Sequence, residues 1–279
     1  MTDFPMKRLR ETLEKVKKSK KLSKFLFCLC LFLFLATIVV IIVYSIKWYK
    51  GQKEQQVLVE QKKTEIPVTE EESIQILPEY RQLYDQNKDL IGWITIEDSV
   101  IDYPVMQTPE DENYYLDKDF EKKKNDNGSL IMDTDSNVGV GTIENKYQNG
   151  TPPSTNLIIH GHNMKNGQMF GGLFQYQEQD YEKEHSIISF DSLYEHRKYQ
   201  VIAVFYSEVF YADQDVFKYY NFFEADSLSE FNDWYKNIKE LSLYDTEVEA
   251  KFGDEFITLS TCSYHVEDGR FVVVGKRIE

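Results

Sequence analysis

An unbroken apolar run near the N-terminus constrains this chain more than any other feature. The 22 positions from Phe25 to Ile46 contain no charged residue. A helix of this length rises about 1.5 Å per residue to roughly 33 Å, which is enough to cross the core of a bilayer. A buried helix of a globular core seldom lacks a polar face over such a length. A cleaved signal peptide would have a shorter apolar region followed by a small-residue cleavage site. The run therefore predicts an uncleaved transmembrane helix over 25–46.

Basic residues are concentrated on the N-terminal side of this run. Residues 1–24 contain nine lysines and arginines and three acids, whereas only Lys47, Lys50 and Lys53 follow closely after it. Basic flanks stay on the cytoplasmic side of a membrane. We therefore predict a cytoplasmic basic tail over 1–24, a single pass through the cell membrane, and an extracellular location for the rest of the chain.

The chain beyond the basic tail is strongly acidic. It carries 23 basic and 44 acidic residues, out of 32 and 47 in the whole sequence. Proteins that bind nucleic acid need basic surface, so no nucleic-acid partner is expected. An acidic balance of this size favours solubility and says little about the fold.

The extracellular part divides into a linker and a domain. Residues 47–72 are mostly polar and charged and contain Pro67, which predicts a stalk that is helical near the membrane and flexible beyond. Residues 73–279 are long enough to bury a core without disulfides. Apolar residues recur at helical spacing over 76–84 and 227–241, with Asp226 or Ser227 as the N-cap of the second helix. About eight short strands predict one barrel or sandwich with added helices. The predicted strands are 91–97, 100–107, 129–133, 156–162, 186–190, 198–210, 256–262 and 270–278.

Cys262 is the only cysteine outside the apolar run, where Cys28 and Cys30 are most simply small apolar residues. In an oxidising compartment a lone cysteine is either buried and inert or reactive, and composition leaves both open. Cys262 ends the predicted strand 256–262, where it is held rigidly yet can face solvent. A thiolate there would be a nucleophile that needs a partner for proton transfer.

Histidine is the natural partner for such a thiol. The five histidines are His160, His162, His185, His196 and His265. His265 follows Cys262 in the same loop, and close neighbours in sequence seldom face each other across a site. His185 and His196 lie in charged surroundings typical of the surface. Two candidates at the end of one strand are left.

Those candidates, His160 and His162, flank Gly161 at the end of the strand 156–162. Side chains two residues apart in a strand lie on the same side of it. Without a cysteine to pair with, either is more often a strand-end histidine whose ring nitrogens are satisfied by hydrogen bonds.

Arg270 opens the last predicted strand, after the loop that follows Cys262. If strands 256–261 and 271–275 are neighbours, its guanidinium returns to the thiol. Arginine stays charged, so its use would be electrostatic, as a partner for the oxyanion of a tetrahedral intermediate. The alternative is a surface arginine paired with Glu267 or Asp268. Arg277 is expected to be structural.

These segments together resemble the sortase family, the membrane-anchored cysteine transpeptidases of Gram-positive bacteria. TLSTC at 258–262 is similar to the family's cysteine motif, and NLIIHGHNM at 156–164 is similar to its histidine segment. The similarity spans roughly 74–278. The resemblance implies that Cys262 is the nucleophile, that His162 is the general acid and base, and that Arg270 stabilises the oxyanion. It implies no cofactor and no metal.

The helix 227–241 before the cysteine strand resembles the insertion of class B sortases, as does the segment that opens the domain. This implies a mainly β fold with added helices. Its centre would be a closed eight-stranded sortase-type β-barrel, with N-terminal helices and a helix inserted before the cysteine-bearing strand. The catalytic domain would be 73–279.

The implied activity is cleavage of the C-terminal sorting signal of exported proteins through a thioacyl intermediate. The protein is then transferred to a cell-wall amine, from a peptidoglycan precursor or a pilin. Two alternatives remain open on the residues alone. One is a surface cysteine peptidase that uses water as the acceptor. The other is a non-catalytic, membrane-anchored binding domain with Cys262 buried in its core.

Overall fold

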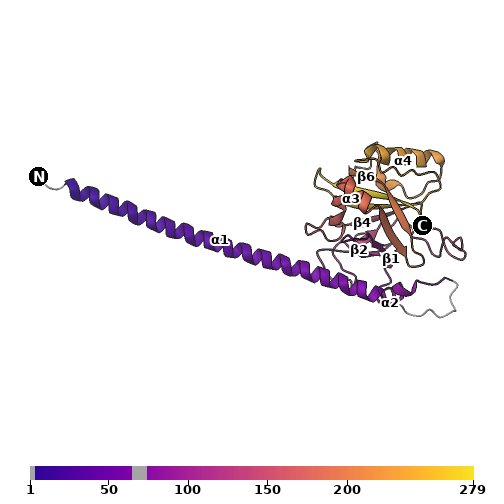
Figure 1. Ribbon diagram of the computed structural model, residues 1–279, viewed down its shortest axis with the longest axis horizontal. Coiled ribbons are helices and arrows are strands. Elements are labelled where there is room, and N and C mark those ends of the chain that lie inside the picture. Colours follow the sequence, from indigo (N-terminus) through magenta and orange to yellow (C-terminus); the bar gives the residue numbers. More distant parts are fainter. Residues whose placement is uncertain (1–3, 65–73) are drawn as a thin grey trace. The chain divides into compact units, whose positions relative to one another are not determined.

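A computed structural model describes residues 4–64 and 74–279 of the chain, with side chains from residue 24 onward. The start of the predicted tail, the end of the predicted stalk and the predicted domain start at 73 lie outside the described residues. The chain forms two compact units, 1–54 and 55–279. Figure 1 shows their secondary structure.

The long helix α1 (Phe4–Lys62) forms the first unit up to residue 54, and its last residues, 55–62, belong to the second unit. From Lys24 this helix is long and apolar enough to cross a membrane, and its most apolar stretch is entirely unburied within the protein. The predicted span 25–46 lies within Lys24–Lys62, the part of the helix that could cross a membrane. Because apolar side chains left in water are costly, the helix fits a single-pass membrane anchor.

Eight strands of the second unit close into a β-barrel in the order β1-β2-β3-β4-β7-β8-β6-β5. Neighbouring strands are antiparallel, apart from the parallel pairs β2–β3 and β4–β7. The eight strands and the closed barrel confirm the predicted fold class. The strands are β1 (Leu90–Thr95), β2 (Asp102–Met106), β3 (Leu130–Met132), β4 (Asn156–Gly161), β5 (Ile187–Ser192), β6 (Lys198–Glu208), β7 (Phe256–Cys262) and β8 (Gly269–Arg277).

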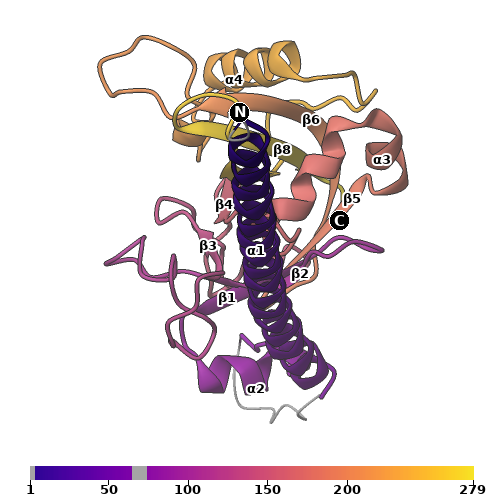
Figure 2. The same cartoon turned by 90° about the vertical axis from the view of Figure 1, so that its left-hand side faces the viewer.

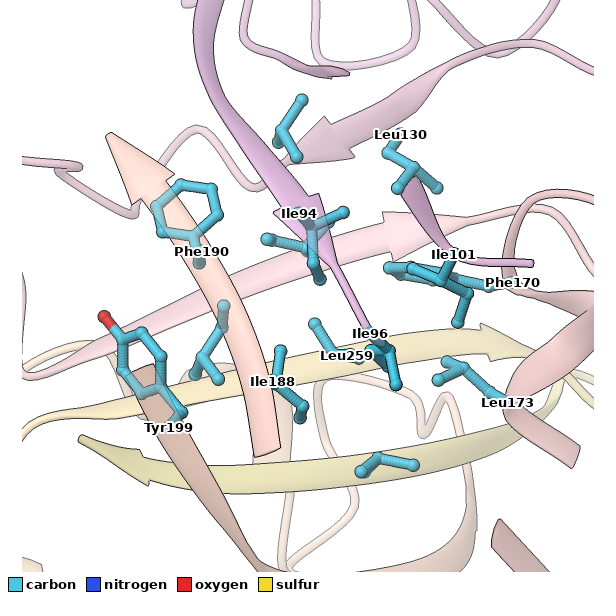
Figure 3. Close-up of a cluster of buried hydrophobic side chains, with 14 of the residues drawn as sticks. Ile94, Ile96, Ile101, Leu130, Phe170, Leu173, Ile188, Phe190, Tyr199 and Leu259 are labelled. Carbon is cyan, nitrogen blue, oxygen red and sulfur yellow. The ribbon is translucent and has the colours of Figure 1, made fainter. Parts of the chain in front are cut away.

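Alternation along the strands sends side chains to the two faces of the barrel wall. Ile94, Phe190 and Leu259 come from three strands and meet in the buried cluster that fills the interior, as Figure 3 shows. Phe256 and Val274 face outward and belong to a second buried cluster. The barrel wall is therefore apolar on both faces at β7 and β8.

Helix α4 (Leu228–Leu241) covers the outer face at β6, as Figure 2 shows. It begins at its N-cap Ser227, whose hydroxyl accepts a hydrogen bond from the backbone N–H of Glu230 at 3.2 Å. Trp234 of α4 stacks on Phe222, with ring centroids 4.3 Å apart. The predicted helix 227–241 and its cap are confirmed. The other helical segments are α2 (Pro78–Gln86), η1 (Phe170–Gln177), α3 (Gln179–Glu184) and η2 (Tyr219–Asn221).

The last turns of α1 pack against the second unit, to which residues 55–62 belong. Leu58 and Val59 contact a third buried cluster that contains Tyr80 and Trp93. The Lys62 ammonium lies 5.4 Å from the Tyr80 ring centroid and 5.0 Å from that of Trp93, a cation–π geometry. The segment expected to be a polar stalk thus contributes one apolar helical face to the domain.

Candidate active site

Cys262 is the last residue of β7, and Arg270 is its direct cross-strand partner on β8. The two strands are therefore neighbours, which is the condition on which a role for Arg270 at the thiol depended. Residues directly opposite in an antiparallel pair project from the same face, with Cβ atoms roughly 4.5–5.5 Å apart. The preceding residue, Thr261, is buried, whereas Cys262 is exposed. The thiol and the guanidinium therefore share the outer face at one end of the barrel.

The Arg270 side chain is held at the base of the loop between β7 and β8. Its Nη1 donates to the carbonyl oxygens of Asp268 at 3.1 Å and of Gly269 at 3.0 Å. A Cβ at Gly269 would lie 2.4 Å from the carbonyl oxygen of Ser263, so the loop closes too tightly there for a side chain. Among the described residues Arg270 forms no ion pair. The alternative of a surface arginine paired with Glu267 or Asp268 required a carboxylate to neutralise its guanidinium, and no described carboxylate does.

His162 reaches the same end of the barrel on the other side of Cys262. Strand β4 is the parallel neighbour of β7, and their last pair is Gly161 with Thr261. His162 and Cys262 are the residues that directly follow this pair, one on each strand. The His162 Nε2 donates to the carbonyl oxygen of Leu116 at 2.7 Å. Because a carbonyl can only accept, Nε2 carries a hydrogen, and Nδ1 is the nitrogen left to take up a proton.

The three residues singled out from the sequence therefore lie at the ends of three adjacent strands, β4, β7 and β8. No hydrogen bond joins the thiol to the imidazole among the described contacts. The chemistry assembled there is an exposed thiol, a half-buried imidazole and a tethered cation. An exposed thiol argues against the binding-domain alternative, which required Cys262 in the core.

The rings of two other histidines near this end of the barrel contact neighbouring polar groups through a ring nitrogen. His160 Nε2 lies 3.1 Å from the Asp133 carboxylate. His265 Nδ1 lies 2.9 Å from the Ser263 hydroxyl, and its ring packs against Tyr206 with centroids 4.7 Å apart. His160 thus fits the alternative of a strand-end histidine held by a hydrogen bond, and the ring of His265 is held within its own loop.

The last two histidines are less alike than the sequence suggests. His196 is exposed, and its ring lies 3.1 Å from Asp191 and 3.4 Å from Glu79. The hydrogen bond to Asp191 raises the pKa of His196 above its usual value. His185 is half-buried rather than a surface residue, because its ring stacks on Tyr181 with centroids 3.9 Å apart. Neither contacts β4, β7 or β8 in the described interactions.

Arg277, at the other end of β8, has a structural role, as predicted. Its side chain is 7% exposed and lies between the carboxylates of Glu255, at 2.7 Å, and Glu195, at 3.2 Å. It also donates to the Tyr147 hydroxyl at 3.2 Å, which ties the loop before β4 to the barrel. This is a buried ion-pair network, whose integrity depends on every partner.

Two further residues belong to the site and were not found by sequence reasoning. Tyr219 lies on the same outer face, and its hydroxyl is 2.7 Å from that of Ser260. Burial raises the pKa of Tyr219 to about 12, and its hydroxyl interacts electrostatically with Arg270 and Cys262. Asn163 donates from its amide nitrogen to the carbonyl oxygen of Cys262 at 3.0 Å. Its only signal in the sequence is its place directly after His162.

The described residues contain no group of three or more histidine, cysteine, aspartate or glutamate side chains placed to hold a metal ion. An arrangement of this kind can serve covalent catalysis, in which a thiol is the nucleophile, an imidazole carries protons and a fixed positive charge faces an oxyanion.

Comparison with known proteins agrees with this geometry. Residues 94–278 match the model of the sortase domain family. The chain is 32% identical over 207 residues to sortase B of Listeria monocytogenes, an alignment that covers 73% of this chain and 76% of that protein. It is 29% identical over 206 residues to sortase B of Staphylococcus aureus, with the same coverage of both proteins.

Solved structures give the same result at the level of the fold. A crystal structure of sortase B from B. anthracis in complex with AAEK1 superposes with a TM-score of 0.66 at 26% identity, covering 84% of this chain and 99% of that one. A Staphylococcus aureus sortase B–substrate complex superposes with a TM-score of 0.62 at 25% identity, covering 83% and 94%.

Proposed function

The chain belongs to the sortase family and is similar to its class B members, and from this premise we propose which of its residues carry the reaction. The protein is a cysteine transpeptidase that cleaves sorting signals and anchors proteins to the cell wall. We assign Cys262 as the nucleophile, His162 as the general acid and base, and Arg270 as the group that stabilises the oxyanion. The observation that carries the assignment is the meeting of these three residues at the ends of β4, β7 and β8.

The first half-reaction forms a thioester. The Cys262 thiolate attacks a backbone carbonyl carbon of the sorting signal, and the C–S bond forms as the carbonyl oxygen takes up negative charge. The Arg270 guanidinium faces that oxygen from the same side of the sheet. The intermediate collapses as the C–N bond breaks, and the leaving amine takes a proton from the His162 imidazolium. The N-terminal part of the substrate stays on the sulfur.

The second half-reaction reverses these roles. An acceptor amine attacks the thioester carbon, and His162 takes the proton that this amine loses. A second oxyanion forms and collapses, the C–S bond breaks, and the Cys262 thiolate returns. Because each half-reaction needs one proton transfer in the opposite direction, a single histidine serves both.

The acceptor is the finer point of the proposal. We propose an amine of a peptidoglycan precursor or of a pilin, rather than water. The test is product analysis by mass spectrometry, with a fluorogenic sorting peptide and a series of short amine acceptors. Transfer products that grow with amine concentration at the expense of hydrolysis support transpeptidation. Hydrolysis that no amine diverts would identify a peptidase.

The division of the chain follows from the anchor. We propose a cytoplasmic tail over 1–24, the membrane span over 25–46, an extracellular linking segment over 47–72 and the catalytic domain over 73–279. The charge difference across the span supports this orientation. A membrane-impermeant maleimide applied to intact cells should label Cys262. Labelling of Cys262 only after cell lysis would show that the orientation is the opposite of the one proposed.

A further inference from the structure

Two side chains, rather than a further rung of the sheet, join the ends of β4 and β7. The last parallel pair is Gly161 with Thr261. The Thr261 hydroxyl donates to the carbonyl oxygen of Gly161 at 2.7 Å. The Asn163 amide donates to the carbonyl oxygen of Cys262 at 3.0 Å. The two bonds run in opposite directions between the strands, one before and one after the position of His162.

We propose that Asn163 is a positioning residue for transpeptidation, which holds the backbone of Cys262 at a fixed distance from the segment that carries His162. The proposal rests on the proposed roles of Cys262 and His162. Asn163 touches neither the thiol nor the imidazole, so it acts on the reaction only through the placement of these two groups.

The backbone around Asn163 is rigid enough for its side chain to have this effect. Asn163 pairs with Met169 in an isolated bridge. The carbonyl oxygen of His162 accepts a hydrogen bond from the backbone N–H of Phe170 at 3.1 Å. A Cβ at Gly161 would lie 2.4 Å from the Leu130 side chain, so this segment packs directly on the interior cluster. The amide therefore reaches across to β7 from a fixed base.

The chemistry of the hydrogen bond from Asn163 to the Cys262 carbonyl predicts that its loss affects the reaction rate more than the stability of the fold. Only the NH₂ group of the amide can donate to a carbonyl, and a carboxylate in its place cannot. Asn163 is half-buried and Cys262 is exposed, so water can replace the lost hydrogen bond and the fold is little affected. Reacting groups are far less tolerant, since a displacement of about 1 Å costs on the order of a hundredfold in rate.

The test uses the full-length protein in detergent micelles, with a fluorogenic peptide that the unmodified enzyme cleaves. Asn163→Ala and Asn163→Asp both remove the donor, and the second keeps the shape. Each should lower kcat and the single-turnover rate of acyl-enzyme formation by about tenfold or more, with KM within about twofold. The melting temperature should stay close to that of the unmodified enzyme. Asn166→Ala is the matched control, because the Asn166 amide bonds to Gln168 within its own loop, and its kcat should not change.

A second pair of variants keeps the test decisive if an Asn163 variant does not fold. Thr261→Val removes the reciprocal hydroxyl and keeps the shape, whereas Thr261→Ser keeps the hydroxyl. The valine variant should lose turnover, and the serine variant should retain most of it. Equal turnover in these two variants, or an Asn163→Ala enzyme within about twofold of the unmodified kcat, would overturn the proposal. A loss confined to KM or to the melting temperature would also overturn it.

Two more variants distinguish a failure of the Asn163 proposal from a failure of the proposed function on which it rests. Cys262→Ala and His162→Ala should be inactive. If either retains turnover, the site assignment is wrong and the proposal for Asn163 falls with it. If both are inactive while the Asn163 variants are at full speed, only the positioning role is wrong.

Discussion

His160 and His162 differ in the hydrogen-bond partners of their rings, an Asp133 carboxylate for the first and the Leu116 carbonyl for the second. This difference predicts different effects of substitution. His162→Ala should abolish turnover, because both half-reactions need its proton transfer. His160→Ala should retain measurable activity, since its ring is paired with Asp133. His265→Ala is a second control, because its ring bonds to Ser263. Peptide cleavage kinetics decide between them. An inactive His160 variant beside an active His162 variant would reverse the assignment.

Substitution of the two arginines of β8 should have different effects, one on turnover and the other on stability. Arg270→Lys keeps the charge but loses the planar fork of donors, and turnover should fall by about a hundredfold with little change in melting temperature. Arg277→Lys should instead lower the free energy of unfolding by about 1–3 kcal/mol, because it disrupts buried hydrogen bonds to Glu255 and Glu195. Its turnover per folded molecule should stay normal. Steady-state kinetics and thermal unfolding of both variants separate the two roles, and similar mild effects in both would remove arginine from the mechanism.

At the scale of elements, the start of α4 offers a matched pair of serines. Ser227 caps the helix through the backbone N–H of Glu230, and Ser229 is exposed in its first turn. Ser227→Ala should lower the free energy of unfolding by about 1 kcal/mol, because one N–H of the first turn loses its acceptor. Ser229→Ala should change it by less than about 0.5 kcal/mol. Chemical denaturation measures both, and equal values would show that the cap does not stabilise this helix.

Elements with a clear period were predictable, and those set by distant contacts were not. The spacing of apolar residues predicted α4, and short, mainly apolar segments predicted β7 and β8. Helix α3 was missed, because its six residues, QDYEKE, are too few and too polar to show a period. Because the connection from β7 to β8 is short, the sequence indicated that Cys262 and Arg270 would lie together if the two strands pair, and they do.

The other side of the site depends on contacts between segments far apart in the chain. No local pattern predicts that β4 lies parallel to β7, about a hundred residues later. The family resemblance, rather than any period, pointed to His162. The contact between His162 and the Leu116 carbonyl comes from a loop that carries no catalytic motif. Asn163 was missed for the same reason, since its role appears only once Cys262 is seen beside it.

At the scale of the whole molecule, the last turns of α1 should stabilise the catalytic domain. Residues 55–279 form one compact unit, in which Leu58 and Val59 are half-buried. A protein of residues 55–279 should therefore melt higher than one of residues 74–279. The burial of two such side chains is worth about 2 kcal/mol, or about 4–8 °C for a domain of this size.

Both truncated proteins should cleave the sorting peptide, because Cys262, His162 and Arg270, to which we assign the reaction, all lie beyond residue 74. A protein of residues 47–279 is the control, and its melting temperature should equal that of 55–279. Equal melting temperatures for 55–279 and 74–279 would mean that the packing of Leu58 and Val59 adds no stability.

The central claim is that Cys262 carries the substrate as a thioester. Mass spectrometry of the enzyme mixed with a sorting peptide, quenched in acid and digested, tests it directly. The peptide that contains Cys262 should gain the mass of the N-terminal substrate fragment, and hydroxylamine should remove that mass because it cleaves thioesters. Cys262→Ala should form no adduct. An adduct on another residue, or peptide cleavage by the Cys262→Ala enzyme, would contradict the account.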